Sequence, residues 1–302
     1  MEILPLLIER YGEPYADSSC IPTYYVAQQT RQQVTVALNG DGGDELFAGY
    51  ERYQAMLLAE RIPHLAKSMI GTFAKILPDS PRSKNNLRRI KRFLCGAALP
   101  LEQRYMKWIG IFDMVMKKNL YSPEFSQAIN HAAPLSLIAQ YLQNDRGLTR
   151  LDSLLRTDTL TYLPYDLLVK VDITSMANSL EARSPFLDHH LVEFAAKLPA
   201  EYKMKNFVKK YILKKAIKDI LPYENIHRRK MGFGVPVGEW LRGDMKGFLR
   251  ETLLSDTFFN RGYFRPDAVK DLVNKHLRRQ ADFTFQIWAL LMLELWHRRF
   301  RD

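Results

Sequence analysis

The chain has 302 residues, and 47% of them are hydrophobic, so it can bury a large core. This composition excludes a disordered or fibrous protein. The formal net charge of +11 favours an acidic ligand such as a nucleotide, although a nucleic-acid or membrane surface would suit it equally.

Cysteine usage and hydropathy indicate where the protein works. Two cysteines make no disulfide framework and predict a reducing, cytoplasmic setting. The first eight residues carry Glu2 and lack the basic start of a signal peptide. The apolar run near the C-terminus is interrupted by Glu294 and is too short for a membrane span. We therefore expect no membrane partner.

The first elements of the chain predict two helices and a loop. Residues 1–11 read as a short helix end, residues 12–22 as a loop, and residues 23–33 as a second helix. The polar residues 17–19 are suited to cap that second helix. Cys20 has no nucleophile signature around it and is expected to be a small buried residue.

The stretch from Val34 to Tyr53 is the most informative in the chain. Residues 34–38 form an apolar run with three β-branched members, which predicts a buried strand. Residues 39–43, Asn-Gly-Asp-Gly-Gly, interrupt this run, and an amphipathic helix follows. Its apolar positions are Leu46, Phe47, Tyr50, Tyr53 and Leu57. A strand that passes through a glycine-rich turn into a helix is the usual geometry of a ligand site in an α/β protein.

The charge of this turn is unusual. Asp41, Asp44 and Glu45 place three carboxylates where a bare phosphate site would use backbone amides. They would repel phosphate unless a hard cation mediates, and Mg²⁺ held by one or two carboxylates suits that chemistry. An ordinary turn with a helix cap explains the same residues. The spacings of a calcium loop, a Walker motif and G-x-G-x-x-G are absent.

After residue 71 the pattern is almost wholly helical. The most basic run, residues 84–92, predicts a solvated helix face with an apolar underside in preference to nucleic-acid contact. Helical periodicity over residues 148–178 breaks at Pro164. In the second of these helices, Asp166, Lys170 and Asp172 suit surface ion pairs.

Two later segments carry charge in less regular surroundings. Glu181, Arg183 and Asp188 bracket an apolar turn in a segment predicted to be non-helical; a buried ion-pair lock and direct substrate contact both explain them. Residues 228–230, Arg-Arg-Lys, precede a glycine-rich loop and suit either closure over phosphate or an exposed basic loop. From Tyr263 onward we expect two helices, with a core stripe of Ile287, Trp288, Leu291, Leu295 and Trp296.

Four of these stretches together resemble one family. Residues 38–53, LNGDGGDELFAGYERY, resemble the signature of the asparagine synthetase family, L-S-G-D-G-G-D-E-L-F-x-G-Y. Residues 13–22, 166–188 and 229–240 resemble the same family and follow its order. The resemblance covers essentially the whole chain.

The resemblance implies an α/β fold. It corresponds to the C-terminal part of an adenine-nucleotide α-hydrolase-like (PP-loop ATPase) synthetase domain, mostly helical after the first strand. We expect one N-terminally incomplete domain over residues 1–302. Residues 1–60 would be the remnant of the nucleotide-binding sheet, and residues 61–302 the mainly helical portion.

The implied activity is ATP-dependent amide formation. The aspartate side-chain carboxylate attacks ATP to give an acyl-adenylate and pyrophosphate, and ammonia derived from glutamine then displaces AMP. ATP and Mg²⁺ are the implied cofactors, with Asp41 and Asp44 as the metal ligands. Lys230 would stabilise charge at the reacting phosphorus, and Glu181 and Arg183 would shape the site. The residues implied to bind the nucleotide are Gly40, Asp41, Gly42, Gly43, Asp44 and Glu45.

Two features of the family are missing. One is an N-terminal glutaminase domain that begins with a cysteine, where this chain has Glu2, and the other is the pyrophosphate loop S-G-G-x-D-S. The strand over residues 34–38 would also need parallel neighbours on both sides. We therefore expect a fragment, or a chain that pairs with another supplying the rest; a domain without catalysis is the third reading. A homo-oligomer is also open.

Three other functions compete with this interpretation. The nearest is an amide ligase of the same family with a different acceptor, such as a β-lactam synthetase or an enzyme that amidates a cell-surface sugar. The second is a non-catalytic subunit that completes a split synthetase. The third is a basic nucleic-acid-binding domain, which the basic run supports only weakly, so no nucleic-acid partner is expected.

Overall fold

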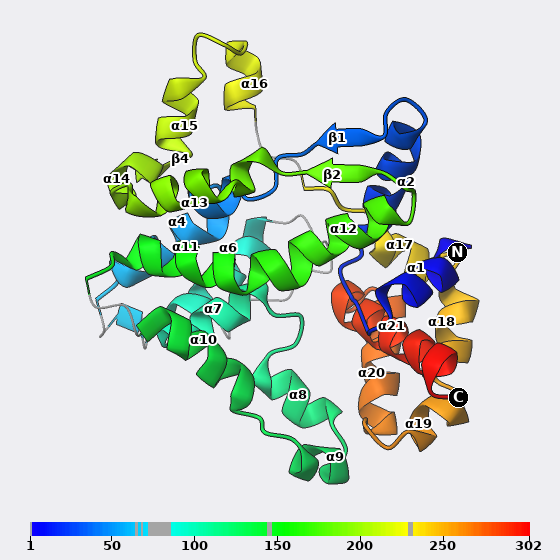
Figure 1. Cartoon of the computed structure of the whole chain (residues 1–302). Helices are drawn as coiled ribbons and strands as arrows, with labels where there is room; N and C mark the ends of the chain where they lie inside the picture. The colour runs from blue at the N-terminus through cyan, green and yellow to red at the C-terminus, as the bar shows by residue number, and fades with distance from the viewer. Residues whose placement is uncertain (1, 64–65, 68, 72–85, 144–146, 229–231) are drawn as a thin grey trace. The chain divides into compact units, whose positions relative to one another are not determined.

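A computed structural model describes the chain except for residues 1, 64–65, 68, 72–85, 144–146 and 229–231. The described residues are mainly helical, with short strands in two two-stranded sheets (Figure 1). This confirms the coarse prediction of a mostly helical chain with few strands. The residues cluster into two compact units, and both units are assembled from segments that are distant in the sequence.

The first unit comprises residues 1–18, 62–136 and 235–302. Its helices are α1 (Ile3–Tyr11), α6 (Asn86–Ala97), α7 (Leu101–Ile109), α8 (Met114–Leu120), α9 (Pro123–Ala128), α17 (Val237–Arg242), α18 (Lys246–Leu253), α19 (Asp256–Asn260), α20 (Pro266–Leu277) and α21 (Thr284–Phe300).

The second unit comprises residues 19–61 and 137–234. Its α-helices are α2 (Cys20–Arg31), α3 (Gly43–Leu46), α4 (Glu51–Glu60), most of α10 (Ala133–Gln143), α11 (Arg150–Leu160), α12 (Val169–Met176), α13 (His189–Lys197), α14 (Ala200–Lys203), α15 (Tyr211–Ala216) and α16 (Tyr223–His227). It also holds a π-helical segment (Leu163–Leu168), a 3₁₀ turn (Pro185–Leu187), and the strands β1 (Val36–Leu38), β2 (Glu181–Arg183), β3 (Met204–Lys205) and β4 (Val208–Lys209).

The predicted strand after residue 33 is present as β1, but it is not buried. β1 runs parallel to β2, with Val36 opposite Glu181 and Leu38 opposite Arg183 (Figure 1). Val36 is 39% exposed and Leu38 is 73% exposed. The prediction of burial between two neighbours is therefore wrong for the described part of the chain, because β2 is the one strand there that pairs with β1.

Helix α2 begins at Cys20, earlier than the predicted residue 23. Ser19 occupies the N-cap position, but its side chain makes no capping hydrogen bond; its Oγ instead accepts one from Lys170 Nζ at 2.9 Å. Cys20 is fully buried, as predicted. α2 packs against α12, which also packs against β2, so these elements form the support of the small sheet.

The single helix predicted after Asp44 is two helices, α3 and α4. The chain leaves the helical conformation over residues 47–50, where Ala48 has a left-handed φ of +57°. The N–H of Gly49 donates to the carbonyl of Asp44 at 2.8 Å and closes a tight turn. Because of this break, the predicted apolar positions no longer share one face, and Leu57 is only partly buried.

The predicted break at Pro164 is confirmed. α11 ends at Leu160, Thr161 leaves the helical region with φ −128°, and Pro164 lies near the start of the π-helical segment that continues into α12. The helix predicted over the basic run is present as α6, although residues 84 and 85 lie outside the described residues. Ile90, an apolar residue within this basic run, is half exposed.

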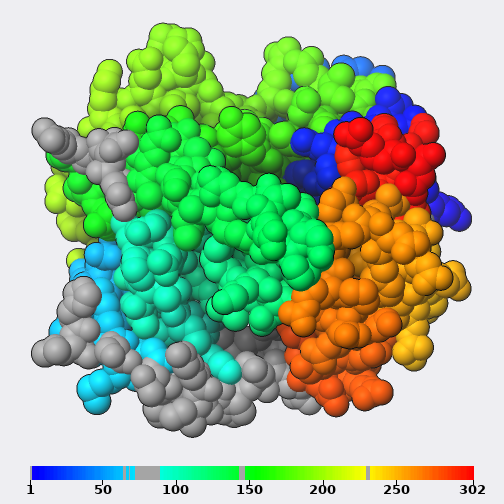
Figure 2. Space-filling view, turned by 90° about the horizontal axis from the view of Figure 1, so that it is seen from below, coloured from blue at the N-terminus to red at the C-terminus, as the bar shows by residue number. Residues whose placement is uncertain are grey.

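The core of the first unit is built on α21, which packs against α1, α17, α18 and α20. Ile287, Trp288 and Leu291 are buried, as the predicted core stripe requires, while Leu295 and Trp296 are partly buried. On the face seen in Figure 2, α20 (orange) lies at the surface beside the red C-terminal end of α21. Across the described residues, no helix is long and apolar enough to cross a membrane.

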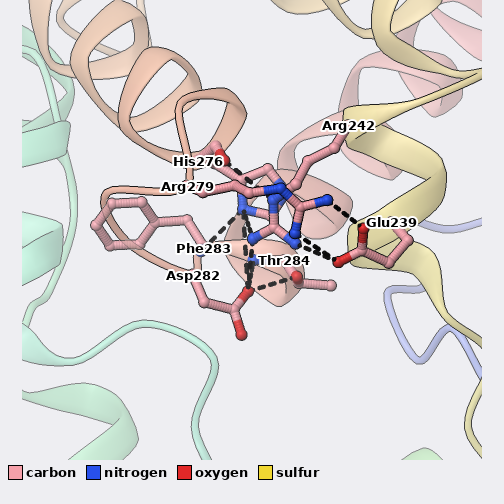
Figure 3. A network of polar contacts seen from close by, with 7 residues as sticks. All are labelled: Glu239, Arg242, His276, Arg279, Asp282, Phe283 and Thr284. Atoms are coloured by element: carbon pink, nitrogen blue, oxygen red, sulfur yellow. Dashed lines mark hydrogen bonds and ion pairs between the residues drawn. The ribbon is translucent and has the colours of Figure 1, made fainter. Parts of the chain in front are cut away.

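A polar network joins α17 to α20 and to the start of α21 (Figure 3). The Nδ1 atom of His276 accepts hydrogen bonds from the N–H of Phe283 at 3.1 Å and from Arg242 Nη2 at 3.2 Å. Arg242 also lies 3.7 Å from Asp282 and 3.1 Å from Glu239. His276 is completely buried, and burial together with the positive charge of Arg242 lowers its pKa to about 4, against the opposing effect of Asp282.

This network predicts acid sensitivity. Between an unfolded histidine pKa of about 6.5 and the folded pKa of about 4, the unfolded chain binds a proton that the folded chain does not. The free energy of unfolding should therefore fall with falling pH across this window, by roughly 1–3 kcal/mol. Urea unfolding near pH 7 and near pH 4.5 measures the fall, and His276→Asn should reduce it.

The exposed His190 on α13 is the matched control, because His190→Asn removes an imidazole that is not buried. This variant should keep the pH dependence of the wild type. An equal fall in His276→Asn and wild type would show that His276 does not carry the effect.

Candidate functional site

The glycine-rich turn begins where the two parallel strands β1 and β2 end. Asn39 follows β1, and its N–H donates to the carbonyl of Arg183 at 2.8 Å. The Oδ1 atom of Asn39 accepts hydrogen bonds from Ser184 Oγ at 2.5 Å and from the N–H of Asp41 at 3.2 Å. The turn is therefore fixed at the carboxyl edge of a parallel pair, which is where α/β proteins bind ligands.

The apolar 3₁₀ turn at residues 185–187 packs against the glycine-rich turn. Gly42 has φ +86°, and a Cβ atom on it would lie 2.2 Å from Leu187 Cδ2. Phe186 packs edge-on against Phe47 of the following break, with 6.1 Å between ring centroids. The 3₁₀ turn at residues 185–187 thus covers the glycine-rich turn, and position 42 requires a residue without a side chain.

Asp44 forms an ion pair that the sequence did not reveal. Lys210 Nζ lies 2.7 Å from Asp44 Oδ1. Lys210 directly precedes α15 and has a left-handed φ of +53°, and its N–H donates to the carbonyl of Phe47 at 3.0 Å. No motif marks this lysine, because it lies in a lysine-rich stretch, residues 203–218, where several neighbours have the same side chain.

Asp41 has a different environment. Burial raises the pKa of Asp41, Lys170 opposes that shift, and the charge of Asp44 adds to it. In the described chain, Asp41 Oδ2 and Asn39 Nδ2 are buried atoms that make no hydrogen bond. Buried polar atoms are normally satisfied, so these two are suited to a ligand that brings a cation or an acceptor to the turn.

The side chain of Glu45 points into the interior. It is 1% exposed and accepts a hydrogen bond from the hydroxyl of Tyr50. Burial raises the pKa of Glu45, and the hydrogen bond from Tyr50 opposes the shift. Its predicted contact with a nucleotide stays a prediction, and the structure gives this carboxylate a supporting position behind the turn.

Behind Glu45 lies a buried cation–aromatic cluster that sequence reasoning missed. The guanidinium of Arg52 lies 3.9 Å from the ring centroid of Tyr50 and 4.7 Å from that of Tyr162. Its Nη2 atom lies 2.6 Å from the fully buried Asp158, which also accepts a hydrogen bond from the hydroxyl of Tyr53. This cluster ties α4 to α11, whose pairing no local pattern predicts.

Glu181 and Arg183 form an ion pair at 2.6 Å on β2, but their side chains remain 53% and 64% exposed. Asp188 does not join them; it caps α13 by accepting the N–H groups of His190 at 3.0 Å and Leu191 at 3.4 Å. The predicted buried lock is therefore wrong, because the three charges separate into an exposed pair and a helix cap. Contact of Glu181 and Arg183 with substrate stays a prediction.

Lys230 and the Mg²⁺ site are the two remaining predicted features of the site. Lys230 lies outside the described residues, together with Arg229 and Met231. Within the described chain, no group of three or more histidine, cysteine, aspartate or glutamate side chains could hold a metal ion. The predicted Mg²⁺ site at Asp41 and Asp44 therefore has two carboxylates, and water or the substrate would supply its remaining ligands.

The glycines of the turn should differ in their tolerance to alanine. Gly42→Ala would place a Cβ atom against Leu187 at a left-handed φ, and should lower the free energy of unfolding by about 1–3 kcal/mol. No atom of the described residues lies within 4 Å of a Cβ added to Gly40, so Gly40→Ala should change the free energy of unfolding by about 0.5 kcal/mol or less. Urea unfolding measures both variants, and equal losses would contradict the role of Leu187.

Comparisons with known proteins place the chain in a family. The Asparagine synthase family model matches residues 1–298. Glutamine-hydrolysing asparagine synthetase 1 of Bacillus subtilis is 34% identical, over 98% of this chain and 45% of that protein. A putative asparagine synthetase of Mycobacterium tuberculosis is 32% identical, over 97% and 44%. The amidase chyE of Penicillium rubens is 23% identical, over 82% and 39%.

The chain thus spans less than half the length of these curated relatives. The family match nevertheless covers nearly all of this chain, and it agrees with the glycine-rich, carboxylate-bearing turn at the end of β1. The chain belongs to the asparagine synthase family.

Proposed function

We propose that this chain is part of an ATP-dependent amide ligase that makes asparagine from aspartate. The observation that carries the proposal is the partly buried pair Asp41 and Asp44 at the carboxyl edge of β1 and β2, in a chain that matches the family over residues 1–298. A bare helix cap would not require two carboxylates with lysine partners and an unsatisfied oxygen.

The residues of the turn fit a Mg²⁺–ATP complex. Among the described residues, Asp41 Oδ2 is buried and makes no hydrogen bond, and a hard cation prefers such carboxylate oxygens. Asp41 and Asp44 would hold the cation, whose charge would neutralise the polyphosphate. Gly40 leaves its Cβ position open among the described residues, so a phosphate could approach its backbone closely, whereas Leu187 and Phe186 pack against Gly42 and Gly43.

The reaction proceeds in two displacements. A side-chain carboxylate oxygen of aspartate attacks the α-phosphorus of ATP, and pyrophosphate leaves. The nitrogen of ammonia then attacks the acyl carbon, and AMP leaves with the former carboxylate oxygen. The protein holds the reactants together and balances charge. Lys230 would stabilise charge at phosphorus, and the exposed side chains of Glu181 and Arg183 are free to meet the ligand.

We propose that a further segment completes this site. The ladder to β2 uses the carbonyl of Thr35 and the N–H of Asn39, so the backbone groups of Val36 and Leu38 face the opposite side. In the described chain no strand covers that side. A strand that leads into a pyrophosphate loop, from the same polypeptide or a second chain, would pair there and bury Leu38.

Two alternatives differ in what the assembled site does. The 23% identity to a fungal protein named as an amidase supports a site of this family that acts on another acceptor. A non-catalytic subunit of a split synthetase would share the open edge of β1 without using Lys230. Exchange of the acceptor and substitution of Lys230 therefore separate the three possibilities.

Pyrophosphate release from Mg·ATP with aspartate and ammonia is the test. The chain alone should be silent, and adding a chain that carries S-G-G-x-D-S should start release that depends on aspartate. Lys230→Ala should reduce this release by about 10²–10³-fold, as the loss of one transition-state charge contact does. Release with another carboxylate but not aspartate would favour the different acceptor, and release unaffected by Lys230→Ala would contradict the role given to Lys230.

A further inference from the structure

The ion pair between Lys210 and Asp44 is built by the backbone. Lys210 has a left-handed φ of +53°, which is unusual for a residue with a side chain, and its N–H is held by the carbonyl of Phe47 at 3.0 Å. These constraints aim the side chain at the turn, where Nζ lies 2.7 Å from Asp44 Oδ1.

Gly49 lies against the ion pair of Asp44 and Lys210. A Cβ atom on residue 49 would lie 1.8 Å from Asp44 Oδ1 and 2.4 Å from Lys210 Cε. Gly49 therefore leaves the space that the two side chains occupy. The left-handed backbone of Lys210, its hydrogen bond to Phe47 and the space left by Gly49 together fix the position of the ammonium group. This distinguishes the pair from an incidental surface contact.

The charges of the turn explain why a cation is needed there. Asp41 and Asp44 are close enough to repel each other, and Lys170 offsets the charge of Asp41 while Lys210 pairs with Asp44. The Oδ1 atom of Asp44 that faces Lys210 is buried, but the side chains of Lys210 and Asp44 are 32% and 19% exposed, so another cation would approach Asp44 through its exposed part.

We propose that Lys210 is the resident counter-ion of Asp44 and that a divalent cation exchanges with it. In the absence of the cation, the ammonium of Lys210 neutralises Asp44. When the cation takes Asp44, the ammonium is released beside the turn, where it can pair with an anionic ligand. This inference rests on the assignment of Asp44 as a metal ligand in the proposed function. It adds that the ammonium of Lys210 competes with the metal ion for Asp44.

Mn²⁺ binding without nucleotide tests the exchange. Lys210→Met removes the competing cation and should bind Mn²⁺ about tenfold more tightly than the wild type, a factor typical of losing one partly buried ion pair. Free Mn²⁺ is measured by electron paramagnetic resonance during titration of each protein. Lys210→Arg keeps a cation at this position and should bind Mn²⁺ like the wild type.

Two controls make the result specific. Lys218→Met removes the same charge from a side chain that is 68% exposed and 3.7 Å from Asp219, and it should change Mn²⁺ affinity by less than about twofold. The double variant Asp44→Asn, Lys210→Met should lose the whole gain. If Lys210→Met does not fold, as judged by circular dichroism, Lys210→Gln is equally neutral and carries the same expectation.

The proposal is overturned if the neutral Lys210 variant binds Mn²⁺ within about twofold of the wild type or more weakly, or if the gain survives Asp44→Asn. These outcomes are independent of the proposed ligase activity, because the titration contains no nucleotide, acceptor or partner chain. Tighter Mn²⁺ binding without pyrophosphate release in the reconstituted assembly would leave the exchange intact and contradict the ligase assignment.

Discussion

Crowding three carboxylates into one turn is the constraint on which the second unit depends. Asp41, Asp44 and Glu45 would repel one another in a partly buried turn, and a different partner stabilises each carboxylate. Asp44 pairs with Lys210, Asp41 is offset by Lys170, and Glu45 accepts a hydrogen bond from Tyr50. These partners come from three different segments of the chain. The turn is therefore the point at which distant elements are joined. The same contacts fix the fold of the unit and balance the charge of the site.

The same constraint accounts for the irregular backbone around the turn. The break between α3 and α4 carries a left-handed Ala48 and the close-packed Gly49, and Lys210 is left-handed as well. Such conformations cost free energy and persist where the surrounding contacts require them. Here the contacts are the ion pair of Asp44 and the apolar cover from Phe186 and its neighbours. A regular helix continuing from Asp44 would carry residue 49 elsewhere and close the space that the ion pair uses.

Local sequence patterns predict the features that depend on neighbouring residues alone. The turn, the break at Pro164 and the buried stripe on α21 follow from periodicity and from the chemistry of glycine and proline, and the structure contains all three. The pairing of Lys210 with Asp44 and of Arg52 with Asp158 joins residues far apart in the chain, and no periodic signal marks such pairs. The sequence predicts too much burial for β1, because an apolar run indicates what a strand can pack against, whereas β2 is its one partner strand among the described residues.

The open side of β1 and the unsatisfied turn lie in the same part of the second unit. Val36 and Leu38 expose apolar side chains on the strand that leads directly into Asn39 and Asp41, and no strand among the described residues pairs with their outer backbone groups. An exposed apolar edge favours pairing with another strand. A strand that pairs there would also end beside the turn, because parallel strands share one carboxyl edge. One such strand would then both cover Leu38 and bring new groups to the buried oxygen of Asp41, so assembly of the sheet and completion of the site would depend on the same contact.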